Sequence, residues 1–295
     1  MKDTFSDCNP IVNFVFYIGV FVMGVFFVHP LFLVCSVIFS LSYFVLIKKN
    51  RRKFIIRMMG LSIMLSIVNP LFNTQGEKVL FTYFGGRPYT FEAFCYGIAL
   101  AAMFVTIITW FTTYNQVMTS DKFLYCFGRL TPSISLILTM VMRMVPNFQN
   151  KIEYIVCARK CIGKSVENAT RQEKFEHGVV IVSALTSWAL EDGVIMADSM
   201  KSRGFGMGKR SSFSIYRMRA LDKQLLILIG ILIITILICA FNGGMAVDYT
   251  PQMHISGIDC IWTVLGGICY FIFLSIPTVM HVKEELTWRI LKSKI

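Results

Sequence analysis

Gly163, Lys164 and Ser165 form the end of the phosphate-loop pattern G-x-x-x-x-G-K-[ST], which binds nucleotide phosphates. The pattern requires a first glycine five residues before Gly163, and this chain has Ala158 at that position. In a phosphate loop, the first glycine lets backbone N–H groups turn inward toward the phosphates. The three-residue match alone is therefore weak support for nucleotide binding.

The residues before this stretch also have the wrong pattern for a phosphate loop, which needs a buried strand before it and a helix after it. Four of them instead fall on one face of a helix: Phe148, Ile152, Ile155 and Arg159. Pro146 suits the first turn of such a helix. We therefore expect an amphipathic helix that begins near Pro146 and ends in Arg159, and a chain that does not bind ATP itself.

Other residues that could support catalysis or metal binding are scattered. The four histidines, His29, His177, His254 and His281, are far apart in the sequence, and the H-E-x-x-H pattern is absent. Cys157 and Cys161 are the only close pair among nine cysteines, and they lack the partner pair of a zinc site. We therefore predict no catalytic residues, no metal site and no cofactor, and we interpret the cysteines as small apolar residues in a reducing compartment.

The composition is that of a polytopic membrane protein. Of the 295 residues, 55% are hydrophobic and only 16% are charged, whereas a soluble domain carries roughly 25% charged residues. The net charge of +12 would suggest nucleic acid in a soluble protein. In a membrane protein the location of the charge matters more than its sum, so we predict no nucleic-acid partner.

Six apolar segments are long enough to cross a bilayer, at residues 12–28, 31–47, 54–72, 91–111, 225–241 and 258–280. His29 and Pro30 form the turn between the first two. Two further apolar runs, 131–146 and 177–197, are ambiguous. If neither crosses, only Lys78 and Arg87 of the 29 Lys and Arg residues lie outside, as the positive-inside rule favours. We therefore predict that both termini and the long middle segment are cytoplasmic.

This reading divides the chain into three blocks and predicts an all-α membrane protein. Residues 1–113 form a four-span block, residues 114–222 form a cytoplasmic or interfacial block of amphipathic coupling helices, and residues 223–295 form a C-terminal pair of spans with a basic tail. On the outer side, "KVLFTYFGGRPYTFE" has the form of a hairpin with a turn at Gly85 and Gly86.

The middle block contains a second helix built like the first. Met196, Met200 and Arg203 share one helical face, and Gly204 supplies the usual helix stop. Because arginine presents five donors in a rigid, permanently charged fork, it can bind carboxylates or carbonyls of a partner protein. The alternative is that each arginine reaches lipid headgroups or caps carbonyls at its own helix end.

The two segments "RMVPNFQNKIEYIVCARKCIG" and "ALEDGVIMADSMKSRGFG" resemble the T component of energy-coupling factor (ECF) transporters. In that family, two Ala-Arg-Gly-like motifs end two coupling helices, and each motif binds a groove of one of two ABC-type ATPases. The corresponding residues here are Ala158, Arg159 and Lys160 in the first motif and Ser202, Arg203 and Gly204 in the second. The first motif departs from the family pattern, because Lys160 stands where glycine is usual.

The resemblance implies a non-catalytic subunit of a prokaryotic vitamin or metal importer. Its partners would be two cytoplasmic ABC-type ATPases, a substrate-binding membrane S component and the lipid bilayer of the cell membrane. A membrane-embedded enzyme and a stand-alone secondary transporter stay open as alternatives. For the secondary transporter, Arg57 is the main candidate for a functional charge inside the membrane.

The charge asymmetry makes the topology testable. A map of single-cysteine accessibility from the two membrane faces should place Lys164 and Lys209 in the cytoplasm and Gly85 outside. Labelling of position 164 from the outer face would contradict the cytoplasmic placement of the middle block.

Overall fold

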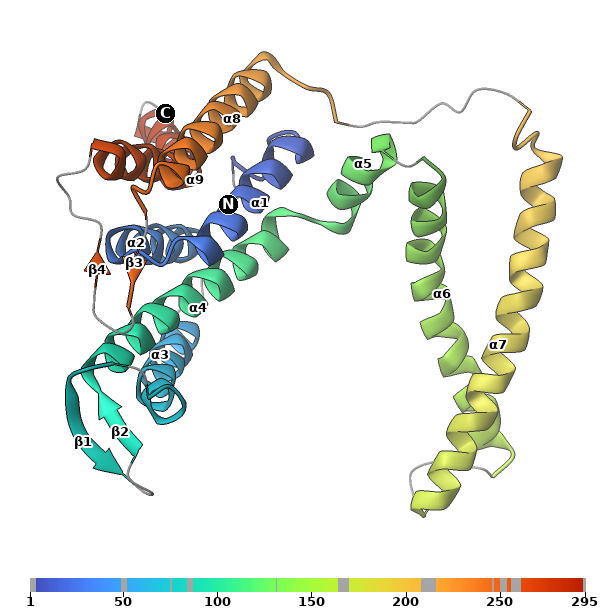
Figure 1. The fold of residues 1–295 in the computed structure, drawn as a ribbon. Coiled ribbons are helices and arrows are strands. Elements are labelled where there is room, and N and C mark those ends of the chain that lie inside the picture. Colours follow the sequence, from blue (N-terminus) through green and yellow to red (C-terminus); the bar gives the residue numbers. More distant parts are fainter. Residues whose placement is uncertain are drawn as a thin grey trace. The chain divides into compact units, whose positions relative to one another are not determined.

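The computed structural model describes residues 4–48, 52–74, 76–83, 87–130, 132–163, 170–207, 216–245, 247–249, 254–255 and 261–293. Over these residues the protein is helical apart from two small hairpins, which confirms the predicted all-α class (Figure 1). Gly85, Lys164 and Lys209, on which the topology prediction rests, lie outside the described residues, as does the start of the last predicted span at Ile258.

The chain divides into two compact units. Unit 1 comprises Met1–Phe123 and Tyr216–Ile295, and it contains the helices α1 (Pro10–Phe26), α2 (Pro30–Ile47), α3 (Arg52–Phe72), α4 (Phe91–Val117), α8 (Ala220–Phe241) and α9 (Ile261–Ser293). Unit 2 comprises Leu124–Ile215, with most of α5 (Ser120–Leu130), and with α6 (Pro132–Cys161) and α7 (Arg171–Ser202). The three-block division by membrane and cytoplasm stays a prediction.

Six described helices are long and apolar enough to cross a membrane: α2, α3, α4, α7, α8 and α9. The first predicted span corresponds to α1, which is apolar but shorter, at 17 residues. By length and composition, α7 is thus a further candidate span, although its apolar run at residues 177–197 was expected not to cross the membrane. The interfacial placement of that run rests on the charge argument and stays a prediction.

Local sequence signals place the ends of several elements. Asn9 and His29 cap α1 and α2, and in each case the next residue is a proline in the first helical turn. The His29 imidazole accepts a hydrogen bond from the Leu31 N–H at 3.3 Å, which confirms the predicted turn. At the same end of unit 1 as His29, β1 (Val79–Tyr83) pairs antiparallel with β2 (Arg87–Thr90), as the hairpin pattern predicted. A second antiparallel pair consists of β3 (Val247–Asp248) and β4 (His254–Ile255).

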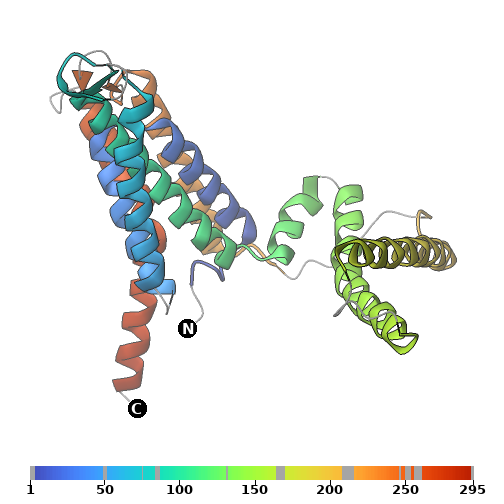
Figure 2. The ribbon, with the colours of Figure 1, turned by 90° about the horizontal axis from the view of Figure 1, so that it is seen from below.

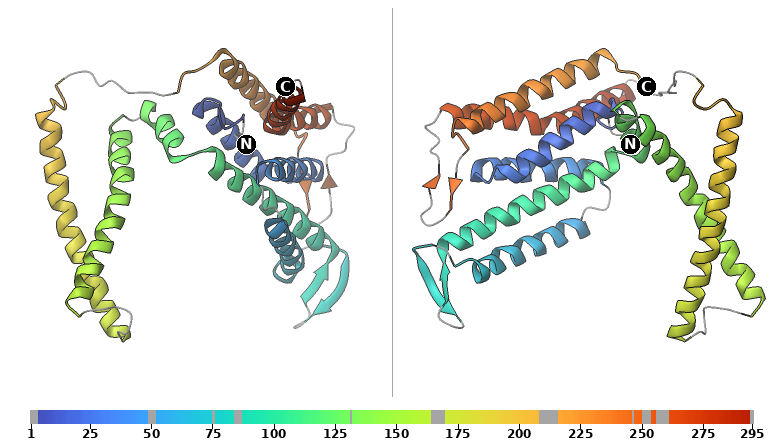
Figure 3. Two further views of the ribbon diagram at one scale, coloured as in Figure 1. Left: turned by 180° about the vertical axis from the view of Figure 1, so that it is seen from behind. Right: turned by 45° about the vertical axis from the view of Figure 1, so that its right-hand side comes forward.

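Five helices of unit 1 form a closed ring of neighbours in the order α1, α4, α2, α9, α8. The sixth, α3, packs on the outer side of α4, as two further views show (Figure 3). The interior of the ring is aromatic. Trp110 of α4 is 1% exposed, and its ring centroid lies 5.7 Å from that of Phe16 and 5.8 Å from that of Tyr43. Aromatic pairs therefore join α1, α2 and α4 in the core.

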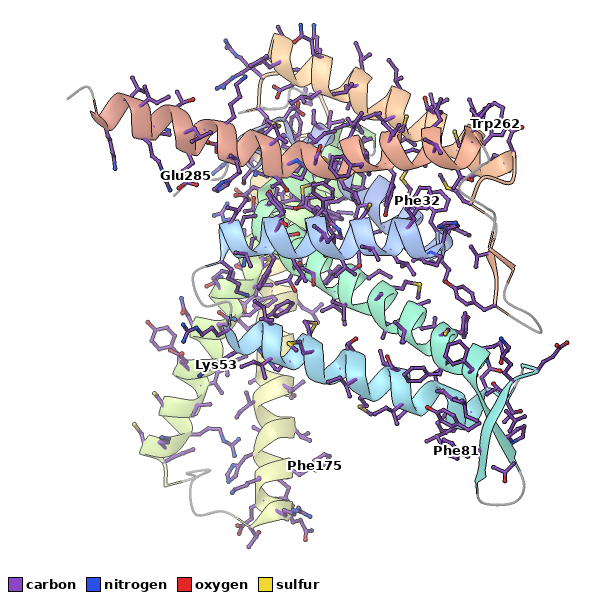
Figure 4. The ribbon with its side chains drawn as sticks, turned by 90° about the vertical axis from the view of Figure 1, so that its left-hand side faces the viewer. Phe32, Lys53, Phe81, Phe175, Trp262 and Glu285 are labelled. Atoms are coloured by element: carbon purple, nitrogen blue, oxygen red, sulfur yellow. The ribbon has the colours of Figure 1, made fainter. Side chains whose placement is uncertain are left out.

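The two ends of unit 1 differ in charge. Lys53 and Glu285 lie at one end, and Phe81 and Trp262 lie at the other (Figure 4). The first end, which we call the cationic end, also holds the N- and C-terminal parts of the chain (Figure 2). Among the described Lys and Arg residues of unit 1, Lys78 and Arg87 are at the opposite end and the others belong to the cationic end: Lys48, Arg52, Lys53, Arg57, Lys122, Arg217, Arg219, Lys223, Lys283, Arg289 and Lys292.

The buried position of Trp110 predicts a large cost for its truncation. Trp110→Ala removes a fully buried ring, which typically costs about 3 to 5 kcal/mol. We expect a clear fall in the midpoint of thermal unfolding of the purified protein. Size-exclusion chromatography of heated samples measures this midpoint. Phe104→Ala on the same helix is the control, because Phe104 is 43% exposed. Equal loss of stability in both variants would contradict the aromatic core.

Candidate functional site

Unit 2 carries both predicted arginine motifs, and the helix of the first motif is longer than predicted. α6 runs without interruption from Pro132 to Cys161, so Pro146 is an interior residue and not the first turn. The predicted start was wrong because Pro132 fills the first-turn position. An interior proline removes one backbone hydrogen bond and commonly kinks a helix without having to end it. The helical context of Ala158 and Arg159 also contradicts a phosphate loop, whose Lys164 and Ser165 lie outside the described residues.

Both motif helices end at a glycine in the left-handed conformation. Gly204 has φ +76°, its N–H donates to the Lys201 carbonyl, and the Phe205 N–H donates to the Met200 carbonyl. These two bonds define a Schellman motif and confirm the predicted helix stop. Gly163 has φ +78°, and its N–H donates to the Lys160 carbonyl at 3.0 Å. The two helix ends therefore share a left-handed glycine whose N–H donates to the carbonyl three residues earlier.

The arginines occupy different places relative to these glycines. Arg203 is the C-cap residue of α7, directly before Gly204. Arg159 lies in the last turn of α6, four residues before Gly163. The two helix ends thus present their arginines at different distances from the terminal glycine and in different directions around the helix axis.

α6 and α7 form an antiparallel pair (Figure 1). The Phe148 and Trp188 rings meet edge-on at 5.7 Å, and the Lys151 ammonium lies 4.9 Å from the centre of the Trp188 ring. Further toward the end of α6, Arg159 contacts His177 in the second turn of α7. Residue numbers rise along one helix as they fall along the other, so the C-terminal half of α6 lies against the N-terminal half of α7.

Arg159 is held within this pair. Its guanidinium Nη2 hydrogen-bonds to the His177 Nδ1, and its Nε atom is buried with no hydrogen-bond partner among the described residues. The contact requires a neutral imidazole with its proton on Nε2, so that Nδ1 accepts. Sequence reasoning missed His177, because a partner eighteen residues away on another helix leaves no local signal.

Arg203 is free where Arg159 is held. It is exposed, and within the described part of the chain its guanidinium has no hydrogen bond or ion pair. Ser202 and Gly204 beside it are exposed too, and the Ser202 hydroxyl donates back to the Asp198 carbonyl. In the first motif, Ala158 and Lys160 are exposed and Arg159 is half-buried.

The structure does not bring the two arginines together. Arg159 lies beside His177, and Arg203 is at the far end of α7, about 39 Å along the helix at 1.5 Å per residue. Two groups this far apart cannot act on one small molecule. They can each contact a separate macromolecular partner.

The helix pair between the arginines is apolar and uncovered. No described residue of α7 is buried, and large apolar side chains are exposed along both helices: Ile134, Ile137, Val141, Ile152, Phe175, Val182, Leu190, Val194 and Ile195. A continuous surface of exposed apolar side chains is typical of a contact with a membrane or with another protein. Arg57, the candidate charge for a secondary transporter, is exposed near the cationic end of α3 and donates to the Lys53 carbonyl.

Comparisons with known proteins do not identify this chain: no family model matches it, and no curated protein is similar enough to match. Among the described residues, the structure contains no cluster of three or more His, Cys, Asp or Glu side chains that could hold a metal ion. Its functional assignment therefore depends on the geometry of α6 and α7 and on the resemblance of the two motifs.

The contact between Arg159 and His177 predicts that His177 stabilises the α6–α7 pair. A hydrogen bond to a charged group contributes about 1.5 to 3 kcal/mol, so His177→Ala should speed amide hydrogen exchange in the last turns of α6 by about 10-fold or more. Glu176→Ala is the control, because Glu176 is exposed one residue earlier on the same helix. Hydrogen exchange measured by mass spectrometry on peptides that cover Arg159 tests this. Unchanged exchange in His177→Ala would show that the contact does not hold the helices.

Proposed function

We propose that this protein is the transmembrane coupling subunit of an ECF-type ABC importer. The observation that carries the proposal is the pair of like-built helix ends in unit 2, each with an arginine, at opposite ends of an uncovered apolar helix pair. In this proposal Arg159 and Arg203 each bind one of two cytoplasmic ABC-type ATPases. The chain transmits their ATP-driven motion and carries no catalytic residue itself.

The separation of the arginines supports two protein partners. Each guanidinium has five donors and matches the carboxylates and carbonyls that line a groove on a protein surface. Because about 39 Å of helix separates them, one groove cannot take both. A pair of ATPases offers two equivalent grooves, and a change in their spacing upon ATP binding would move α6 relative to α7.

The exposed apolar side chains of α6 and α7 suit the remaining partner. A small membrane S component that binds a vitamin or a metal would pack on this surface, and lipid would cover the rest. The charge distribution of unit 1 favours a cytoplasmic location for the cationic end, with both termini inside and the β1–β2 hairpin outside. The proposed location is the prokaryotic cell membrane.

Arginine substitutions test this function directly. Truncation of an arginine that is desolvated against a partner costs roughly 2 to 5 kcal/mol, or about 30-fold or more in affinity. We expect Arg203→Ala and Arg159→Ala each to weaken co-purification of the ATPase pair, and the double change to abolish it. Arg203→Lys should restore binding only in part, because an ammonium cannot reproduce the bidentate fork.

The same co-purification experiment includes a control variant and has an outcome that would contradict the proposed function. Lys201→Ala removes an exposed cation in the last turn of α7 and should leave ATPase recovery unchanged. Recovery is normalised to the amount of each variant in the membrane. We expect Arg203 to be the more sensitive site, because Arg159 must first leave His177. Wild-type ATPase recovery by the double variant would remove the physical basis of the proposed function.

A further inference from the structure

The chain enters unit 1 through a short turn, residues 4–9, that we call the N-terminal turn. The Asp7 N–H donates to the Thr4 carbonyl at 3.1 Å, and the Cys8 N–H donates to the Phe5 carbonyl at 3.3 Å. Its residues contact six helices at the cationic end: α1, α2, α4, α5, α8 and α9.

Phe5 inserts the turn into the aromatic core. It is 0% exposed, and its ring centroid lies 5.1 Å from that of Phe16 on α1 and 6.4 Å from that of Tyr43 on α2. The Thr4 hydroxyl contacts the Glu284 carboxylate of α9. The turn therefore closes the ring of helices at this end.

Asp222 ties the turn to the start of α8. It is buried, and its two carboxylate oxygens accept from two separate backbone groups: Oδ1 from the Asn9 N–H at 3.3 Å and Oδ2 from the Arg219 N–H at 2.9 Å. One carboxylate thus serves the N-terminal ends of α1 and α8, where a negative charge is favourable.

Lys122 ties the same turn to the end of α4. It is 8% exposed, its ammonium donates to the Ser6 hydroxyl at 2.7 Å and to the Val117 carbonyl at 2.8 Å, and it also contacts the Ser6 carbonyl. Val117 is the last residue of α4, so its carbonyl has no partner within the helix. A buried ammonium is costly unless acceptors surround it, and three acceptors meet it here.

The two clamping residues flank the places where the chain leaves and re-enters unit 1. Unit 2 begins at Leu124, two residues after Lys122, and the chain returns at Tyr216, shortly before Asp222. On the unit 1 side, a residue close to each crossing is therefore fastened to one turn. We propose that the N-terminal turn is the joint through which movement of unit 2 reaches the helices of unit 1, with Lys122 and Asp222 as its positioning residues.

This inference rests on the proposed function, since it needs ATPases that move unit 2. In this proposal, residues clamped beside both crossings pass a displacement of the chain into the helices of unit 1, whereas unclamped residues absorb it in local rearrangement. Loss of either clamp should therefore leave the arginines free to bind the ATPases. The same loss should stop the helices of unit 1 from responding to ATP binding by the ATPases.

The first experiment tests the clamp without any partner. Hydrogen exchange of the peptide that covers residues 4–9 is measured in the purified full-length chain by mass spectrometry. Lys122→Met keeps the length of the side chain and removes the charge, and it should speed exchange by at least about 10-fold. Lys122→Arg should retain most of the protection, and Lys223→Met, an exposed lysine in the first turn of α8, should have no effect. Asp222→Asn provides a second route if Lys122→Met does not yield a monodisperse protein. Unchanged exchange in the folded variants would overturn the clamp.

The second experiment tests the joint in the complex with co-purified ATPases. In wild type, ATP with vanadate should change the exchange rate of residues 4–9. In Lys122→Met or Asp222→Asn, ATPase recovery should stay at the wild-type level while the response to ATP with vanadate is lost. An unresponsive wild-type complex, or equal responses in all variants, would overturn the joint. Failure of wild type to recover any ATPase would instead contradict the proposed function, and the result of the partner-free experiment would still stand.

Discussion

Hydrocarbon supplies no hydrogen bonds, so a protein within it must pair its own polar groups, and this constraint explains where unit 1 places its few charges. Its helices satisfy their backbone groups internally along most of their length. What remains are the helix ends, and at the cationic end these meet the buried side chains of Asp222 and Lys122. The position of the N-terminal turn follows from this pairing: it supplies the Asn9 N–H to the carboxylate and two Ser6 oxygens to the ammonium.

Features that depend on local sequence could be predicted, and features that depend on a distant partner could not. The apolar segments, the turn at His29 and the helix stop at Gly204 follow from hydropathy, capping and glycine chemistry over a few residues. The start of α6 was misplaced because Pro146 is locally compatible with a helix start, and only the continuation from Pro132 shows otherwise. The roles of His177 and Lys122 arise from contacts across 18 and 116 residues of sequence, which no periodicity records.

The candidate site illustrates the same limit at finer scale. The sequence presents Arg159 and Arg203 as equivalent ends of two similar helices. In the structure the environment separates them, because the Arg159 guanidinium turns toward α7 and the Arg203 guanidinium stays exposed. Under the proposed function, a partner would gain the whole of its interaction with Arg203, whereas binding to Arg159 would have to offset the loss of the His177 contact. Two motifs of one type can thus differ in affinity through a residue outside either motif.

The two arginines differ in environment, but the antiparallel helices α6 and α7 that carry them are arranged approximately symmetrically. Two antiparallel helices are related approximately by a two-fold axis perpendicular to them, which exchanges their C-terminal ends. Two related ATPases that assemble about a two-fold axis present equivalent grooves in the same relationship. The shared glycine ends at Gly163 and Gly204 fit that symmetry, whereas the offsets of the two arginines and the single histidine contact break it. Under the proposed function, a single chain would therefore meet a symmetric pair of ATPases at both ends and bind them with unequal strength.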